Sequence, residues 1–421
     1  MLDLKLIRSE TERVKAALAR RGADGQIDEL LELDARRRTL LPEIEAVRGE
    51  RKTESEKIGA LKKAGEDAET QIAAVHELKA RLETLETELS EVEVKRDRIA
   101  VTLPNIPDPS APEGFTDEDA VELRKVGEPP SFGFEPRDHL ELAEPGGLID
   151  MEAGAKTSGT RFTYLKGDLA MLELSLVQYA LSVLREEGHE PVVPPVLVRE
   201  EALYGTGFLP GDREQIYELP KDDLFLVGTA EVPLASMHAD AIFEAGELPV
   251  RYAGFSTCFR REAGAAGRDT RGIFRVHQFD KVEMFSFVEP TMAVEEHERI
   301  LAIEERILTE LGLPYRVVNV AVGDLGSSAA KKFDCEAWIP SQGRYRELTS
   351  CSNTTDFQAR RLSCRYRPEP KAGTEFVNTL NGTAVAVGRT LIAILENHQR
   401  EDGTVALPKV LRDYGAPETI G

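Results

Sequence analysis

Two neighbouring segments in the middle of the chain concentrate side chains that bind phosphates and amines. Residues 259–264 read Phe-Arg-Arg-Glu-Ala-Gly, and residues 274–285 form a strand-like run. Every second residue of a strand shares a face, which here would carry Arg275, His277, Phe279, Lys281 and Glu283, with Phe274, Val276, Val282 and Met284 opposite. Guanidinium groups bind phosphates, a phenyl ring stacks on a base and a carboxylate pairs with an ammonium. The face suits a nucleotide that also has an amine end, although a solvated face rich in ion pairs would show the same residue types.

Two further segments carry polar side chains next to apolar runs. Gly-Thr-Ala-Glu at 228–231 follows the strand-like run 224–227, which would place a hydroxyl and a carboxylate at a strand end. Residues 378–389 read as a polar turn that opens an apolar-striped helix, and Arg389 in its first turns is a reasonable anion site. An ordinary capped helix with an exposed arginine is the alternative. No P-loop and no dinucleotide-binding glycine motif occurs in the sequence.

The remaining pattern predicts an α+β body. Strand-like runs cover 191–198, 224–227, 251–259, 271–288, 315–322 and 333–339, and helical patterns cover 168–187, 291–311 and 384–397. Strands mostly follow strands, without regular alternation with helices. We therefore expect an antiparallel sheet flanked by helices.

The first quarter of the chain predicts an antiparallel two-stranded coiled coil. A heptad stripe runs through residues 30–61 and resumes over 75–103, after a polar turn at 62–67. Such a hairpin should project as an arm and bend near Pro42, and a dimerisation or spacer rod is its simplest interpretation. Prolines from Pro104 end the second helix. The predicted division is 1–103 for the N-terminal domain, 104–136 for a proline-rich linker and 137–421 for the catalytic domain.

Composition excludes several classes of protein. The chain has 421 residues, of which 41% are hydrophobic, but no run of about 18 apolar residues and no signal peptide, so membrane and secreted proteins are excluded. Four scattered cysteines predict neither disulfides nor a zinc site, and indicate reduced thiols in the cytosol. The net charge of −22 argues against a general nucleic-acid binder, although the first 103 residues are nearly balanced in charge.

Three of these segments resemble the signature motifs of class II aminoacyl-tRNA synthetases. Residues 259–262, with the strand that ends at Glu283, resemble motif 2, and Gly388-Arg389 with its helix resembles motif 3. Pro195 is placed like the motif 1 proline of the dimer interface. Within the class, the chain looks like a bacterial-type seryl-tRNA synthetase, because the arm matches and no cysteine ligands for a zinc-dependent serine site are apparent. This closer resemblance rests on residues 229–231, 276–279, 281–283, 347–352 and 381–383.

The resemblance implies a role for each matching residue. Serine would be bound by Thr229, Ala230, Glu231, Arg260, Glu283, Asn381 and Thr383. ATP would be bound by Arg260, Arg261, Glu262, Arg275, Phe279, Glu347, Leu348, Thr349, Ser350 and Arg389. Mg²⁺ would be held by Glu347 and Ser350, because a hard cation prefers oxygen ligands. The catalytic residues would be Arg260, Glu347 and Arg389, and no zinc is expected.

The resemblance also implies partners. They are L-serine, tRNA(Ser) and tRNA(Sec), and a second copy of the chain, with cytoplasmic localisation and no membrane. Basic residues of the arm are candidate contacts to the RNA backbone: Arg36, Arg37, Arg38, Arg48, Arg51, Lys52, Lys62 and Lys63. Two alternatives stay open at this point. One is a related enzyme that loads an amino acid onto a carrier protein, and the other is a non-catalytic coiled-coil protein with a decayed synthetase body.

Overall fold

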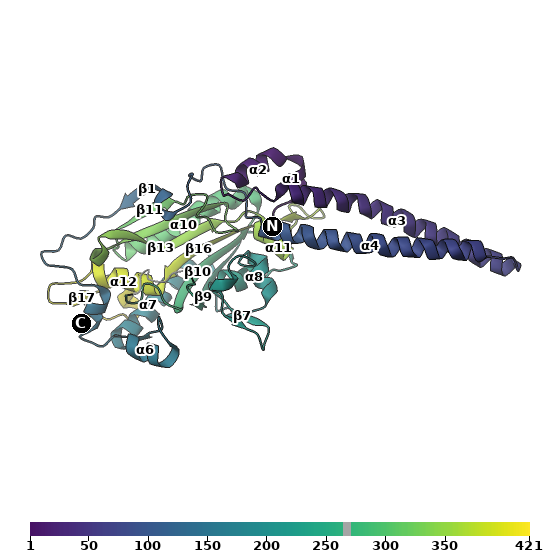
Figure 1. The fold of residues 1–421 in the computed structure, drawn as a ribbon. Helices are drawn as coiled ribbons and strands as arrows, with labels where there is room; N and C mark the ends of the chain where they lie inside the picture. The colour runs from purple at the N-terminus through teal and green to yellow at the C-terminus, as the bar shows by residue number, and fades with distance from the viewer. Residues whose placement is uncertain (264–270) are drawn as a thin grey trace. The chain divides into compact units, whose positions relative to one another are not determined.

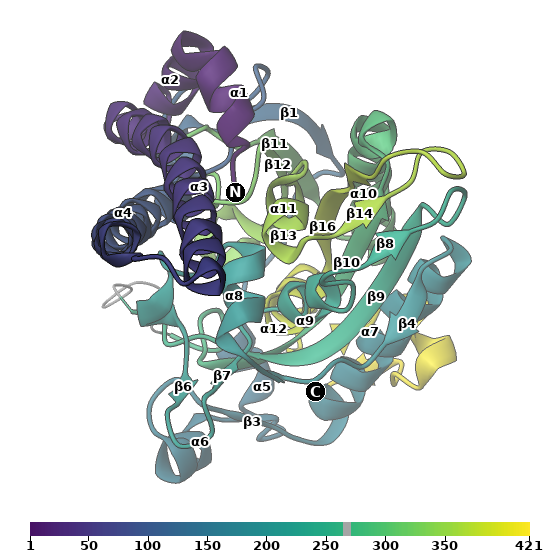
Figure 2. The same cartoon turned by 90° about the vertical axis from the view of Figure 1, so that its right-hand side faces the viewer.

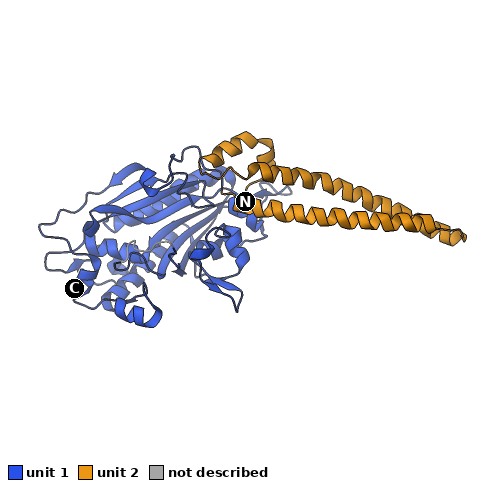
Figure 3. Cartoon of the chain, in the orientation of Figure 1, with its two compact units in different colours: residues 1, 105–421 blue, residues 2–104 orange. Residues whose placement is uncertain are grey.

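The computed structural model describes residues 1–263 and 271–421, which divide into two compact units (Figure 3). One unit is Leu2–Pro104, and the other comprises Met1 with Asn105–Gly421. The Ala/Gly-rich composition of residues 263–267 predicts a loop that is mobile without tRNA, and this segment lies outside the described residues from 264 onward.

The N-terminal unit is built around a helical hairpin. Its helices are α1 (Leu4–Ser9), α2 (Thr11–Ala19), α3 (Ile27–Ala64) and α4 (Glu69–Thr102). Helices α3 and α4 run side by side in opposite directions (Figure 1), as the heptad stripe predicts. Gly65, in the left-handed region with φ 74°, ends α3. Pro42 lies inside α3 without ending it. The buried seam is formed by Leu40, Ile44, Val47, Leu82, Leu85 and Val92.

The second unit contains an eight-stranded sheet, with strand order β1-β11-β12-β13-β16-β10-β9-β4. Neighbouring strands are antiparallel except β4 and β9, which are parallel. The predicted, mainly antiparallel α+β body is thus confirmed. The strands are β1 (Val121–Val126), β4 (Glu190–Val192), β9 (Val250–Phe259), β10 (Gln278–Val288), β11 (Tyr315–Asn319), β12 (Lys331–Ile339), β13 (Arg344–Asn353) and β16 (Asn378–Ala386).

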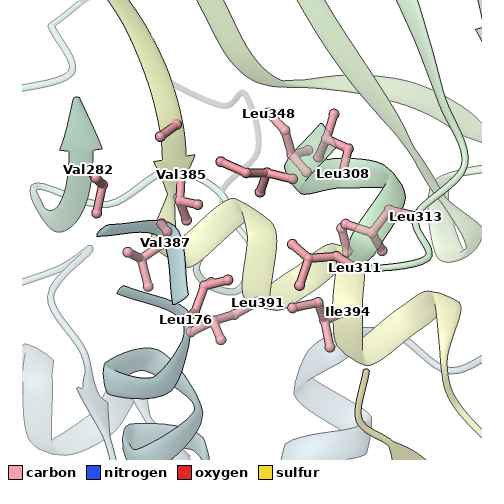
Figure 4. Close-up of a cluster of buried hydrophobic side chains, with 14 of the residues drawn as sticks. Leu176, Val282, Leu308, Leu311, Leu313, Leu348, Val385, Val387, Leu391 and Ile394 are labelled. Atoms are coloured by element: carbon pink, nitrogen blue, oxygen red, sulfur yellow. The ribbon is translucent and has the colours of Figure 1, made fainter. Parts of the chain in front are cut away.

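Three long helices cover one face of this sheet: α7 (Gly167–Glu186), α10 (Ala293–Glu310) and α12 (Val387–Asn397). Figure 4 shows the apolar cluster between them, with Leu176 of α7, Leu308 of α10 and Leu391 of α12 gathered near Val385 of the sheet. Burial of this layer fixes which side of β10 and β16 faces the helices.

Shorter helices cover other parts of the unit. Helices α8 (Glu200–Thr206), α9 (Glu231–Ser236) and α11 (Phe357–Leu362) pack together (Figure 2). The remaining short elements are α5 (His139–Ala143), β2 (Ile149–Asp150), α6 (Met151–Ser158), β3 (Tyr164–Leu165), β5 (Leu197–Val198), β6 (Glu218–Leu219), β7 (Leu224–Leu226), β8 (Ile242–Phe243), β14 (Arg365–Tyr366), β15 (Glu375–Phe376), β17 (Val405–Ala406) and β18 (Thr419–Ile420).

Strand β16 corrects the prediction of a polar turn and helix at its position. Residues 378–386 are a strand, and the helix starts only at Val387. Every residue of β16 before Ala386 is buried, the polar Thr379, Asn381 and Thr383 included, so the alternation that marks a half-exposed strand is missing. Strand β13 was not predicted at all, and β10 begins at Gln278 rather than at residue 271.

The expected linker at 104–136 is largely part of the second unit. Strand β1 pairs with β11 along the sheet edge, and the backbone amides of Asn105 and Asp108 donate to the carbonyls of Ser327 and Ala330. The prolines end α4, but the chain beyond them is tied down by hydrogen bonds. The compact unit therefore begins at Asn105.

Helix α7 is the one described helix that is long and apolar enough to cross a membrane. Half of its apolar window is buried inside the protein, where Leu172, Leu176 and Ala180 lie in the core. It serves as a core helix of the sheet layer. Cys258, Cys335, Cys351 and Cys364 are free and buried.

Candidate active site

A cavity of about 370 Å³ opens on the face of the sheet opposite α12 and gathers most of the predicted site residues. Along β10 and β16, Glu283 and Thr383 border it, whereas Met284 and Val385 lie in the core. The predicted residues that line the cavity are Thr229, Glu231, Arg260, Glu262, Arg275, Phe279, Glu283, Glu347, Leu348, Ser350, Asn381, Thr383 and Arg389.

Three predicted residues do not line the cavity. Ala230 is fully buried in a hydrophobic cluster under β9. The guanidinium of Arg261 lies over the ring of Tyr217, 5.3 Å from its centroid. The Thr349 hydroxyl points toward α10 and donates to Oε2 of Glu304 at 3.0 Å. Their side chains therefore lie outside the lining of this cavity.

A β-bulge in β13 places Glu347 and Ser350 on the same face. Residues three apart in a regular strand point to opposite faces. Here the pairing shifts by one residue at Leu348, so that Thr349 pairs with Cys335 and Glu347 pairs with Glu336. Leu348, the extra residue, is buried in the core cluster. The bulge thereby presents two oxygen donors to the cavity.

A second bulge, in β16, aligns the pair that faces the other end of the cavity. The shift falls between Val282 and Glu283 and leaves Ala384 as the extra residue, so that Glu283 pairs directly with Thr383. The Thr383 hydroxyl donates to Oε2 of Glu283 at 3.4 Å. Lys281 forms an ion pair with the same carboxylate. This end of the cavity therefore holds a buried carboxylate and a hydroxyl side by side.

Glu231 supplies a second buried carboxylate at this end. It is the first residue of α9, and its Oε1 accepts hydrogen bonds from Gln358 at 2.7 Å and Asn381 at 3.1 Å. Burial raises the pKa of Glu231 to about 7 and Glu283 adds to the rise, while the Gln358 hydrogen bond, Lys281 and Arg260 oppose it. An ammonium group placed here would favour the ionised carboxylate.

Positive charge dominates the opposite end. Arg389, the third residue of α12, donates from Nη1 to the Glu347 carbonyl at 2.9 Å. Desolvation would raise the pKa of Glu347, but Arg389, with Lys332 and Arg260, outweighs it and lowers the pKa to about 2. The Arg260 guanidinium lies 5.2 Å from the centroid of Phe279. This end can bind phosphate groups and an aromatic base.

Glu262 holds a strained backbone conformation at the edge of the cavity. Its φ is 51°, in the left-handed region that few residues other than glycine adopt. Such strain persists only where the surroundings hold the residue in place, and it is common at functional sites. The backbone amide of the preceding Arg261, bonded to the Gln215 carbonyl, is one such restraint.

Several residues that border the cavity or support it were not predicted from the sequence. Lys332 and Asp212 line the cavity, as does the loop 326–329. Gln358 does not line it but holds Glu231. Lys332 lies two residues before Asp334, and the two side chains form an ion pair at 3.2 Å. This spacing of lysine and aspartate was the one sequence signal that could have indicated Lys332.

A magnesium ion bound with ATP fits the donor set at the phosphate end. The Glu347 carboxylate and the Ser350 hydroxyl are hard oxygen donors on one face of β13. Within the described ranges, no cluster of three or more His, Cys, Asp or Glu residues is arranged to hold a metal by itself. Phosphate oxygens would therefore have to supply further ligands.

Comparisons with known proteins agree with this fold and site. Residues 216–398 match the tRNA synthetase class II core domain (G, H, P, S and T). A prolyl-tRNA synthetase of Giardia lamblia shares the fold at 15% identity, with a TM-score of 0.56 over 64% of this chain and 54% of that one. The fold and the cavity thus define a class II aminoacyl-tRNA synthetase.

The particular branch of the class follows from full-length relatives. Residues 1–107 match the seryl-tRNA synthetase N-terminal domain. The serine–tRNA ligase of Acidothermus cellulolyticus is 50% identical, covering 98% of both chains, and serine–tRNA ligase 1 of Streptomyces avermitilis is 51% identical, covering 98% of this chain and 97% of that one. The seryl-tRNA synthetase of Pyrococcus horikoshii, solved with ATP, has a TM-score of 0.94 at 43% identity, covering 100% and 99% of the chains. The chain belongs to the seryl-tRNA synthetase family and is a serine–tRNA ligase.

Proposed function

We propose that this chain joins L-serine to ATP as seryl-adenylate in the cavity on β10, β13 and β16, and then transfers the seryl group to the 3′ end of tRNA(Ser). The observation that carries the residue assignments is the division of one cavity into two ends. Glu231, Glu283 and Thr383 gather at one end. Guanidinium groups and an aromatic ring gather at the other, where Glu262 and Glu347 form ion pairs with Arg275 and Arg389. Serine fits the first end and ATP the second.

Serine would bind between Glu231 and Glu283. The Glu231 carboxylate would pair with the α-ammonium, with Thr229 and Asn381 beside it. Glu283 and Thr383 would bond the side-chain hydroxyl. If alanine bound in place of serine, the buried acceptor for that hydroxyl would be left without a hydrogen bond. This cost would allow the site to reject alanine.

ATP would bind at the guanidinium end. Glu262 would accept from the adenine amino group, Phe279 would stack on the ring, and Arg275 and Arg389 would hold the outer phosphates. Glu347 and Ser350 would ligate the Mg²⁺ of the nucleotide. When bound, that ion would neutralise charge on the phosphate oxygens.

Catalysis in this cavity would depend on positioning and charge neutralisation. The serine carboxylate attacks the α-phosphorus of ATP, and the bond to the leaving pyrophosphate breaks. Arg260, which lines the cavity, would hold the attacking carboxylate and stabilise the negative charge on the α-phosphate oxygens in the transition state. In the second step a ribose hydroxyl of the tRNA attacks the seryl carbonyl, and AMP leaves. No covalent intermediate with the enzyme is required.

The tRNA-binding domain would be residues 1–103, and the aminoacylation domain would be 137–421.

The structure separates the basic candidates of the hairpin into two groups. Arg36, Arg37, Arg38 and Arg48 form ion pairs with carboxylates on the hairpin. For Arg51, Lys52, Lys62 and Lys63, nearer the turn, the described residues provide no ion pair. These four would contact the backbone of tRNA(Ser) and, by shape, tRNA(Sec).

A homodimer is the proposed assembly, in the cytoplasm. Met171 and Leu174 lie three residues apart on α7 and are 47% and 53% exposed, and Val193, just after the edge strand β4, is 82% exposed. Exposed apolar side chains beside an open sheet edge favour burial against a second copy.

Free, buried cysteines accord with a reducing compartment.

Serine-dependent exchange of pyrophosphate into ATP, together with charging of purified tRNA(Ser), tests the proposal. The full chain should perform both, and Thr383→Ala and Glu283→Ala should raise the serine KM far more than the ATP KM. Equal increases in the two KM values would contradict the serine assignments. Exchange without charging would support the carrier-protein alternative, and absence of exchange would support the decayed-enzyme alternative.

A further inference from the structure

Gln358 is a fully buried glutamine on α11 that makes hydrogen bonds to three other elements. Its Nε2 donates to Oε1 of Glu231 at 2.7 Å and to the carbonyl of Thr206 at 3.1 Å. Its Oε1 accepts from the hydroxyl of Thr379 at 2.8 Å. The side chain therefore connects the end of α8, the start of α9 and the central strand β16.

The chemistry of these partners determines the orientation of the Gln358 amide. The Thr206 carbonyl can only accept, so Nε2 must face it, and Oε1 then faces the Thr379 hydroxyl. Thr354 extends this network, because its hydroxyl donates to the Thr379 carbonyl at 2.8 Å. The network leaves Gln358 one N–H for Glu231 and no freedom to turn over. Glu231 thus receives a donor of fixed position and direction.

The two amides that contact Glu231 converge on a single oxygen. Gln358 and Asn381 both donate to Oε1, and the described part of the chain provides no hydrogen bond to Oε2. Glu231 borders the cavity, together with Thr229. One carboxylate oxygen is therefore occupied by protein donors, and the other is left to receive a ligand.

We propose that Gln358 is a positioning residue for substrate recognition: it holds Glu231 so that Oε2 meets the ammonium group of serine, an inference that rests on the proposed role of Glu231. Gln358 does not touch serine and acts through the carboxylate. It supplies a buried, oriented donor that also favours the ionised form of Glu231. Substrates without an ammonium group would gain nothing from it.

The charged groups around Glu231 predict how pH affects serine binding. Burial, the largest effect, and Glu283 of β10 raise the pKa of Glu231 to about 7, and the Gln358 hydrogen bond, Lys281 of β10 and Arg260 after β9 lower it. Removal of the Gln358 donor would shift the pKa further upward, so less of the carboxylate would be ionised at neutral pH. Serine binding would then improve more steeply with rising pH than in the unmodified protein.

Gln358→Met in the full chain tests the inference, because methionine has a similar unbranched shape without the amide. In pyrophosphate exchange at pH 7, we expect the serine KM to rise about 10- to 100-fold, as for a lost hydrogen bond to a charged group, with the ATP KM and kcat within about threefold. Between pH 6 and 8.5, the serine KM of the variant should fall more steeply than that of the unmodified chain.

Gln399 provides a matched control. It is also a buried glutamine, 5% exposed, and its amide donates to the carbonyls of Arg137 and Glu396, away from the cavity. Gln399→Met should lower stability without a selective change in the serine KM. If Gln358→Met and Gln399→Met change the kinetic constants alike, or if Gln358→Met leaves the serine KM and its pH dependence unchanged, the inference is overturned.

Two further variants keep the test decisive. Thr379→Val removes the closer of the two hydroxyl donors to Oε1 of Gln358 and leaves only Thr354, at 3.4 Å. It should raise the serine KM about 3- to 10-fold, and no rise would overturn the inference if Gln358→Met does not fold. Glu231→Gln distinguishes this inference from the proposed function. An unchanged serine KM in Glu231→Gln would refute the role of Glu231 itself, whereas a raised KM there, with no effect of Gln358→Met, would refute only the role of Gln358.

Discussion

Glu262 and Arg275 form an ion pair within the cavity, with 2.5 Å between Oε2 of Glu262 and Nη1 of Arg275. Both residues are proposed to bind ATP, one at the adenine and the other at a phosphate. In the proposed complex, each of the two side chains would instead contact its own part of the nucleotide. ATP binding would therefore exchange one internal ion pair for two contacts with the ligand, and the pair stabilises the empty site against unpaired buried charge.

Loss of either partner should weaken ATP binding selectively. We expect Arg275→Ala to raise the ATP KM about 10-fold, equivalent to ~1.4 kcal/mol, because it removes a phosphate contact, while the serine KM stays within about twofold. Glu262→Gln should have a smaller effect, since its amide oxygen can still accept. Steady-state pyrophosphate exchange measures both constants. Arg261→Ala is the control, since that guanidinium lies over Tyr217 outside the cavity. A parallel rise in the serine KM would contradict the assignment.

The heptad pattern predicted the helical hairpin, because two seams of the same spacing joined by a short polar turn can bury their apolar residues against each other. The body was harder to predict from its pattern. Strand β16 lies at the centre of the sheet with Thr379, Asn381 and Thr383 buried, so its polar residues suggested a turn. Burial on both faces removes the alternation on which strand prediction depends.

The site residues came from resemblance and local chemistry, and their geometry could not be predicted. Glu347 and Ser350 share a face only because of the bulge at Leu348, which pairing with β12 creates. The same bulge turns Thr349 toward Glu304 and away from the cavity. Gln358 is 127 residues from Glu231 in the chain, and only the fold brings them into contact.

Charge reversal near the hairpin turn should impair recognition of tRNA without affecting the chemistry of serine activation. We expect the double variant Lys62→Glu/Lys63→Glu to raise the tRNA KM about 10-fold or more at low salt, because phosphate contacts are lost and repulsion is added. Serine-dependent pyrophosphate exchange should be unchanged. Arg36→Glu/Arg48→Glu provides a comparison, since those two guanidinium groups are held by Glu88 and Glu86. Equal tRNA KM values for the two double variants would contradict the proposal that the basic residues without an ion pair in the described structure contact the tRNA while the ion-paired ones do not.

A carboxylate on the exposed face of α7 should break the proposed homodimer. Leu174→Glu would place a charge in the proposed interface, beside the exposed Met171, and burying it unpaired would cost several kcal/mol. Sedimentation equilibrium should show a dimer for the unmodified chain and a monomer for the variant at micromolar concentration. Glu186→Lys, farther along the same helix, is a charge-changing control that should remain dimeric. A monomeric unmodified chain would refute the proposed assembly.

Two buried histidines should make the protein less stable in mild acid. Burial lowers the pKa of His189 to about 4, aided by Arg299, and burial likewise lowers the pKa of His297 to about 4 against the opposing hydrogen bond to the Cys351 carbonyl. Both are neutral in the fold, whereas an unfolded histidine titrates near pH 6.5. Between about pH 6.5 and 4 the unfolded chain therefore binds more protons, and stability falls as the pH falls.

Substitution of either histidine should flatten this dependence. By linkage, each histidine lowers the unfolding free energy by about 2 kcal/mol when the pH falls from 7.5 to 5. In His189→Leu or His297→Leu, the unfolding free energy should therefore fall by about 2 kcal/mol less over this pH range than in the unmodified chain. Urea denaturation at the two pH values and one protein concentration measures the difference. Carboxylates with raised pKa values, such as Glu231, make the unfolding free energy rise as the pH falls, which opposes the effect of the histidines. The test is therefore the difference in pH dependence between each variant and the unmodified chain. His76→Leu, at an exposed position on α4, is the control, and a slope unchanged in both buried variants would show that these imidazoles are not the acid-sensitive groups.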